Sequence, residues 1–145
     1  KKIMVAIAAM WKQSLGVQTN LTNQEWKVFL NTRNEKKQTQ VFRAGWIGDY
    51  ADPYTFLETF KKGSAMNYSA FSNDAYDAKL KEAESTTDLA ARAKLLQEAE
   101  KILVDDYPFA PLYYYVTTRL VKPQVKGYQG NPTGTLRTQH LKIEP

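Results

Sequence analysis

The alternation of apolar and polar residues predicts several amphipathic helices. In residues 1–15, the apolar side chains that share one helical face are Ile3, Ile7, Met10 and Trp11. Gly16 follows them, and glycine is common just beyond the last residue of a helix. The basic start and the apolar run after it imitate a secretory signal, but an amphipathic helix explains more of the pattern. We expect further helices at 24–34, from Asp52-Pro53 to Lys61, at 73–84 and at 88–105.

Other segments have the composition of β-strands. Val17, Thr19 and Leu21 alternate with polar residues, which favours a short strand that leads to Thr22 or Asn23 as a helix N-cap. Strand character is also predicted at 39–46, at the aromatic and β-branched run 109–121, and at 136–143. We expect a loop at 34–38 and turns at 127–134. Helices that alternate with strands predict an α/β architecture.

Length and composition restrict the class of protein. The 145 residues, 43% of them apolar, are enough for one domain with a sizeable core. Twenty basic residues exceed fifteen acidic ones, which gives a net charge of +5. The basic residues are spread along the chain, so a solvated surface is favoured over a nucleic-acid interface. No apolar run approaches the roughly 20 residues of a membrane-spanning helix.

The sequence holds little material for catalysis or metal binding. It has no cysteine, which excludes disulfides and thiolate nucleophiles, and His140 is its one histidine. No Gly-x-Ser-x-Gly turn accompanies that histidine, and the acids Asp105-Asp106 are more typical of a helix end than of an acid and base pair. The glycines at 127, 130 and 134 match no phosphate-binding loop. We therefore expect no enzyme, no cofactor and no metal, and a peptide hydrolase is a less favoured alternative.

The stretch FRAGWIGDYADP, residues 42–53, is the most informative one. If it is extended, Phe42, Ala44 and Trp46 point to one face. The opposite face then carries Arg43, Gly45, Ile47 and Asp49. Six extended residues would separate Arg43 from Asp49 by about 20 Å, and a bend at Gly48 would shorten this distance. Such a face has a positive end, a negative end and accessible backbone between them.

Asp49 is a candidate ligand for a positive charge. Aspartate is often a helix cap, but Asp52 stands directly before Pro53 and is better placed for that role. Asp49 is therefore free to bind an ammonium group, while the backbone near Gly45 could pair with an extended peptide as an added strand. Core packing of Trp46 and a surface salt bridge of Arg43 remain open as alternatives.

Several motifs together resemble the C-terminal portion of the periplasmic oligopeptide-binding proteins, which are the solute receptors of peptide ABC transporters. The motifs are FRAGWIGDY at 42–50, NQEWK at 23–27, TR at 32–33, LYYYV at 112–116 and RLVKP at 119–123. The resemblance extends over essentially the whole chain, and a receptor for murein tripeptide is the nearest alternative within the family. It implies a type II periplasmic-binding-protein fold, with a mixed sheet flanked by helices, of which this chain is a lobe fragment.

The resemblance also implies a division of the chain and a set of partners. Residues 1–111 would form most of the C-terminal lobe, and residues 112–145 a hinge strand and a return segment that belongs to the other lobe. The intact receptor would be periplasmic, would close over short peptides and would deliver them to ABC permease subunits. The fragment alone could self-associate through the surface that its missing lobe covers.

Site residues follow from the resemblance position by position. Asp49 matches the aspartate that pairs with the N-terminal ammonium of the peptide, and Gly45 and Ile47 match the strand that pairs with its backbone. The other matched residues are Arg43 and Arg33 near the carboxylate end and side-chain pockets, Trp26 and Trp46 as aromatic pocket walls, and Tyr115 as a hydrogen-bonding tyrosine. Relatives can have a cysteine where Ile47 stands, so a disulfide formed there is absent from this chain.

Overall fold

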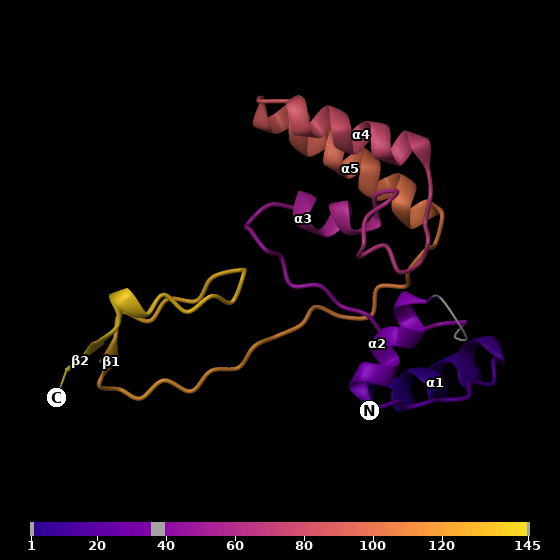
Figure 1. Cartoon of the computed structure of the whole chain (residues 1–145). Helices are drawn as coiled ribbons and strands as arrows, with labels where there is room; N and C mark the ends of the chain where they lie inside the picture. The colour runs from indigo at the N-terminus through magenta and orange to yellow at the C-terminus, as the bar shows by residue number, and fades with distance from the viewer. Residues whose placement is uncertain (1, 36–39, 145) are drawn as a thin grey trace. The chain divides into compact units, whose positions relative to one another are not determined.

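The chain forms two compact units, Lys1–Phe42 and Arg43–Pro145. A computed structural model describes residues 2–35 and 40–144 (Figure 1). Most of the predicted loop at 34–38 and the first residue of the predicted strand at 39–46 lie outside the described residues. A search of the described helices for one with the length and hydropathy of a membrane span found none.

The first unit contains two of the predicted helices. Helix α1 extends over Lys2–Leu15 and α2 over Trp26–Asn34. The N-cap of α2 is Glu25 and not Thr22 or Asn23, because its carboxylate accepts hydrogen bonds from the amides of Lys27 and Val28 at 2.9 and 3.2 Å. A side chain that satisfies the unpaired first-turn amides fixes where a helix begins, so α2 starts two residues later than predicted.

The second unit begins its regular structure with a short helix and continues with two longer ones. Helix α3, Tyr54–Leu57, continues as the 3₁₀ helix η1, Glu58–Phe60, and ends before Lys61 as predicted. Helix α4 covers Asp74–Ser85 and α5 covers Leu89–Asp105. The side chains of Asn73 and Asp88 cap these two helices, which confirms the predicted starts.

The core of the second unit lies where α4 and α5 pack side by side against α3 (Figure 1). Its buried apolar residues are Tyr54, Leu57, Tyr76, Leu80, Ala83, Leu96, Ala99 and Leu103. The fully buried Tyr76 donates its hydroxyl to the carbonyl oxygen of Leu57 at 2.6 Å, so its polar atom has a partner. The core therefore fixes α3, and with α3 the end of the segment that precedes it.

A small sheet lies near the C-terminus. Strand β1, Val125–Lys126, pairs antiparallel with β2, Lys142–Ile143, and the 3₁₀ helix η2, Thr138–His140, precedes β2. Gly127 follows β1 with φ of +78°, and a Cβ atom there would lie 1.9 Å from the carbonyl oxygen of His140. Only glycine satisfies both conditions. The strand predicted at 136–143 is thus confirmed only at its end.

The other predicted strands are not formed. Residues 17–21, 40–46 and 109–121 have no strand assignment, and the described residues contain only the two-stranded sheet. The predicted mixed sheet flanked by helices is therefore wrong for the part of the chain that the structure describes. A strand exists through hydrogen bonds to a neighbouring strand, and these three segments have none within the described ranges.

Candidate functional site

The stretch 43–49 is an exposed connection that leads into α3. Trp46 and Ile47 were expected on opposite faces of an extended stretch. Both are exposed, so burial does not distinguish the two faces. At Gly45, a Cβ atom would meet nothing within 4 Å, which leaves the backbone there open on that side. Gly48 is buried, and a Cβ atom there would lie 3.0 Å from Cγ2 of Thr55. The stretch is therefore open at its centre and held against α3 at its end.

Asp49 and Asp52 have different surroundings. The expected cap position of Asp52 is not confirmed, because the N-cap residue of α3 is Pro53 and the helix begins at Tyr54. Asp52 accepts a hydrogen bond from the amide of Tyr54 at 2.8 Å, and Arg92 of α5 donates to its two carboxylate oxygens at 2.6 and 3.0 Å. The Arg92 hydrogen bonds hold the pKa of Asp52 below its ordinary value. Asp49 uses its backbone amide, which donates to Oγ1 of Thr55 at 3.1 Å. Its exposed carboxylate has no partner among the described residues.

Arg43 lies beside the aromatic segment that follows α5. Its Nη2 atom donates to the hydroxyl of Tyr113 at 3.4 Å. The ring of Tyr113 stacks on that of Tyr115, with centroids 6.4 Å apart and an interplanar angle of 29°. The structure thus brings two predicted site residues, Arg43 and Tyr115, to one cluster through a third residue that was not predicted.

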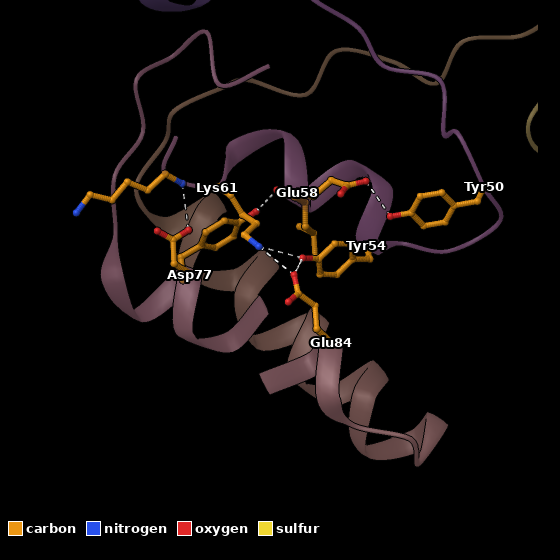
Figure 2. A network of polar contacts seen from close by, with 9 residues as sticks. Tyr50, Tyr54, Glu58, Lys61, Asp77 and Glu84 are labelled. Carbon is orange, nitrogen blue, oxygen red and sulfur yellow. Dashed lines mark hydrogen bonds and ion pairs between the residues drawn. The ribbon is translucent and has the colours of Figure 1, made fainter. Parts of the chain in front are cut away.

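A polar network fixes the end of the stretch to the helices (Figure 2). The hydroxyl of Tyr50 donates to Glu58 at 2.8 Å. The pKa of Tyr50 is raised, mainly by burial and secondly by this hydrogen bond. Tyr54 donates to Glu84 of α4, and Lys61 donates to the same Glu84 oxygen at 2.9 Å. These bonds lower the pKa of Glu84, with the Tyr54 bond as the larger cause. The network keeps α3 in place, and with it the residues on either side of Gly48.

Trp26 and Arg33 belong to the first unit, whereas the other six predicted residues belong to the second. Both lie on α2 next to Phe29. The Trp26 ring centroid is 5.7 Å from that of Phe29, and the Arg33 guanidinium lies 5.6 Å from the Phe29 centroid. Trp26 is largely exposed, which is compatible with a pocket wall.

Comparison with known proteins identifies the family. The model of "Bacterial extracellular solute-binding proteins, family 5 Middle" matches residues 1–68. The chain is 44% identical to the periplasmic murein peptide-binding protein MppA of Escherichia coli, over 90% of this chain and 24% of that protein. It is 42% identical to the periplasmic oligopeptide-binding protein OppA of the same species, over 99% of this chain and 26% of that protein. The chain belongs to the family 5 solute-binding proteins.

Solved family 5 structures superpose on almost the whole chain. The Haemophilus influenzae OppA complex with RPPGFSPFR gives a TM-score of 0.85 at 39% identity, over 98% of this chain and 28% of that one. The unliganded open form of MppA gives a TM-score of 0.84 at 42% identity, again over 98% of this chain and 28% of that one. The architecture is thus that of part of a periplasmic binding protein, in agreement with a type II lobe. The chain spans about a quarter of the length of the curated relatives it matches.

Tyr113, which was not among the predicted site residues, contacts one of them, Arg43. The sequence did contain a clue, because Tyr113 and Tyr115 are two positions apart in the LYYYV run and would share a face if the run is extended. Only the fold, however, places Arg43 beside Tyr113. Two hollows, of about 200 and 440 Å³, lie among residues 119–141, and none of the eight predicted site residues lines them. The assignments of those eight residues stay predictions.

Proposed function

We propose that the chain is part of an extracytoplasmic receptor that binds short peptides and delivers them to an ABC permease. The observation that carries this proposal is the exposed carboxylate of Asp49, without a partner in the described structure, beside an Asp52 that is already engaged. Relatives named as periplasmic oligopeptide-binding proteins support it. A periplasmic location and binding without catalysis are parts of the same proposal, and the relatives compared above are named as binding proteins.

The proposed contacts divide the ligand into three parts. Asp49 receives the N-terminal ammonium group, Arg43 lies toward the carboxylate end, and the backbone of residues 43–47 pairs with the peptide backbone. Trp46, Trp26, Arg33 and Tyr115 contribute walls and polar contacts for side chains. Because ammonium, carboxylate and backbone are common to all peptides, such a site tolerates many sequences. In the intact receptor, residues 1–111 would belong to one lobe and 112–145 to the hinge and return segment.

Calorimetric titration of the intact receptor with trialanine tests the ammonium contact. We expect Asp49→Ala to weaken binding by about tenfold to a hundredfold, since hydrogen bonds to charged groups are strong and a bound ammonium would lose its partner. Glu100→Ala is the matched control, because Glu100 is an exposed acid on α5 with no ion pair among the described residues, and we expect no change. Equal affinities of wild type and Asp49→Ala would refute the contact.

A murein-peptide receptor is the second candidate. It is favoured by the 44% identity to MppA, a protein named for murein peptide binding. Competition between cell-wall tripeptide and trialanine for the intact receptor separates the two. Displacement of trialanine by a much lower concentration of the murein tripeptide supports the second candidate, whereas comparable potency supports the general peptide receptor.

A further inference from the structure

The contact between Arg43 and Tyr113 joins two segments that are 70 positions apart in the sequence. Arg43 precedes α3 in the sequence, and Tyr113 follows α5. Both segments belong to the second unit. The guanidinium of Arg43 therefore has a polar neighbour that its own segment does not supply.

The donors of this pair suit an anion. A guanidinium has five N–H donors, and the structure engages one atom, Nη2, with the Tyr113 hydroxyl. No ion pair between described residues includes Arg43. Because the Tyr113 oxygen accepts from Arg43, its own O–H stays available as a donor. The pair thus offers a cation and several donors without an acidic partner to neutralise them.

Tyr113 is itself held by a neighbour. Its ring stacks on that of Tyr115. A stacked aromatic pair is more favourable than its buried area alone would make it, so the stacking restrains both rings. Tyr114 lies between them and is 97% exposed. The run therefore alternates two stacked rings with one that faces solvent. A restrained hydroxyl can orient a long arginine side chain, which otherwise samples many rotamers.

We propose that Tyr113 is a positioning residue for Arg43, which its hydroxyl orients toward the C-terminal carboxylate of a bound peptide. This inference rests on the proposed function and deepens it, since it adds a residue that acts through Arg43 at one end of the ligand. Tyr113 sets the preference for a free carboxylate over an uncharged end.

The test measures the affinities of the intact receptor for trialanine and for trialanine amide. Tyr113→Phe removes the hydroxyl and keeps the ring. We expect it to weaken binding of trialanine by about fivefold, the effect of one hydrogen bond, and to leave binding of the amide unchanged. Tyr114→Phe is the matched control, with the same substitution on the exposed neighbouring ring. We expect it to preserve the ratio of the two affinities.

A double-substitution cycle separates positioning from direct contact. If Tyr113 acts through the guanidinium, Tyr113→Phe has no further effect on trialanine binding once Arg43→Met is present. Additive losses would overturn the inference, because Tyr113 would then act independently of Arg43. An unchanged ratio of trialanine to amide affinity in Tyr113→Phe would overturn it as well.

The outcomes also distinguish this inference from the proposed function. A wild-type receptor that binds neither trialanine nor its amide contradicts both. A receptor that binds trialanine, loses affinity in Asp49→Ala and keeps its carboxylate preference in Tyr113→Phe contradicts only the role of Tyr113. Thermal melting of Tyr113→Phe, expected to match wild type because the side chain is half exposed, verifies that the variant is folded.

Discussion

Asn67 is a buried amide that organises the loop between η1 and α4. Its Nδ2 atom donates to the carbonyl oxygens of Phe60, Lys61 and Phe71, the last at 2.7 Å. Its Oδ1 atom accepts from the amide of Phe71 and the hydroxyl of Ser69. One side chain thus satisfies polar groups on both sides of the loop, so its loss would leave several of them without partners.

Replacing Asn67 is expected to destabilise the second unit. We expect Asn67→Ala to lower the free energy of unfolding by about 2–3 kcal/mol, because buried carbonyl and amide groups lose their hydrogen bonds. Urea denaturation measures this as a lower midpoint at unchanged slope. Ser69→Ala is the control and removes only the hydroxyl bond to Asn67, with an expected loss of about 0.5 kcal/mol. An Asn67→Ala midpoint equal to that of wild type would contradict this account.

Single residues were predictable from the sequence to different degrees. The bond from the Tyr54 amide to Asp52 could be expected from the sequence, because the two residues are two positions apart at the start of a helix, although the N-cap itself is Pro53. Asn67 and Tyr113 could not be recognised in this way, since their partners are a set of loop carbonyl groups and an arginine 70 positions away. Their roles depend on the tertiary fold, and no local pattern records them.

At the level of elements, helices followed from the sequence and strands did not. Asn73 and Asp88 mark helix starts by local hydrogen bonds, and the apolar spacing of α4 and α5 was visible in the sequence. The segment 109–121 has the residue types of a strand, but it forms no strand in the described chain. Residue types alone favour a strand, but a strand also needs a neighbouring strand to which it can hydrogen-bond, and the local sequence does not record whether one is present.

The ion pair between Asp52 and Arg92 connects the start of α3 to α5 and should make stability depend on pH. We expect Arg92→Met to lower the free energy of unfolding at neutral pH by about 1.5 kcal/mol. The folded-state pKa of Asp52 is lowered, so this stabilisation is complete above the ordinary carboxyl pKa of about 3.9 and is lost as the pH falls through the lowered value.

Urea midpoints of wild type and Arg92→Met from neutral to acidic pH provide the measurement. The urea midpoint of Arg92→Met should be lower than that of wild type at neutral pH, and the two midpoints should converge in acid. Lys94→Met, a change at an exposed cation on the same helix without an ion pair in the described structure, should follow the wild-type curve. Curves of wild type and Arg92→Met that stay parallel into acid would show that the Asp52 charge is not involved.

For the whole molecule, the segment after α5 exposes several large apolar side chains. Tyr114 and Leu120 are 97% and 99% exposed, and Val116 is also largely exposed. Exposed apolar side chains that gather into a patch are typical of a surface that contacts another protein surface or a ligand. Self-association of the isolated chain through this surface stays a prediction.

Dye binding tests whether the rest of the proposed receptor covers this segment. We expect the isolated chain to enhance the fluorescence of 1-anilinonaphthalene-8-sulfonate strongly and the intact receptor to enhance it little, because the dye reports accessible apolar surface. The urea-denatured chain serves as the control for dye binding without structure. Equal enhancement by the isolated chain and the intact receptor would contradict coverage.

Gly127 has a consequence for comparing related sequences. Its backbone and the carbonyl of His140 approach so closely that any side chain at 127 is excluded. A homologue with another residue at the aligned position must therefore connect its last two strands differently. The identity of this one residue can thus serve as a diagnostic in an alignment, sorting homologues that share this C-terminal hairpin from those that do not.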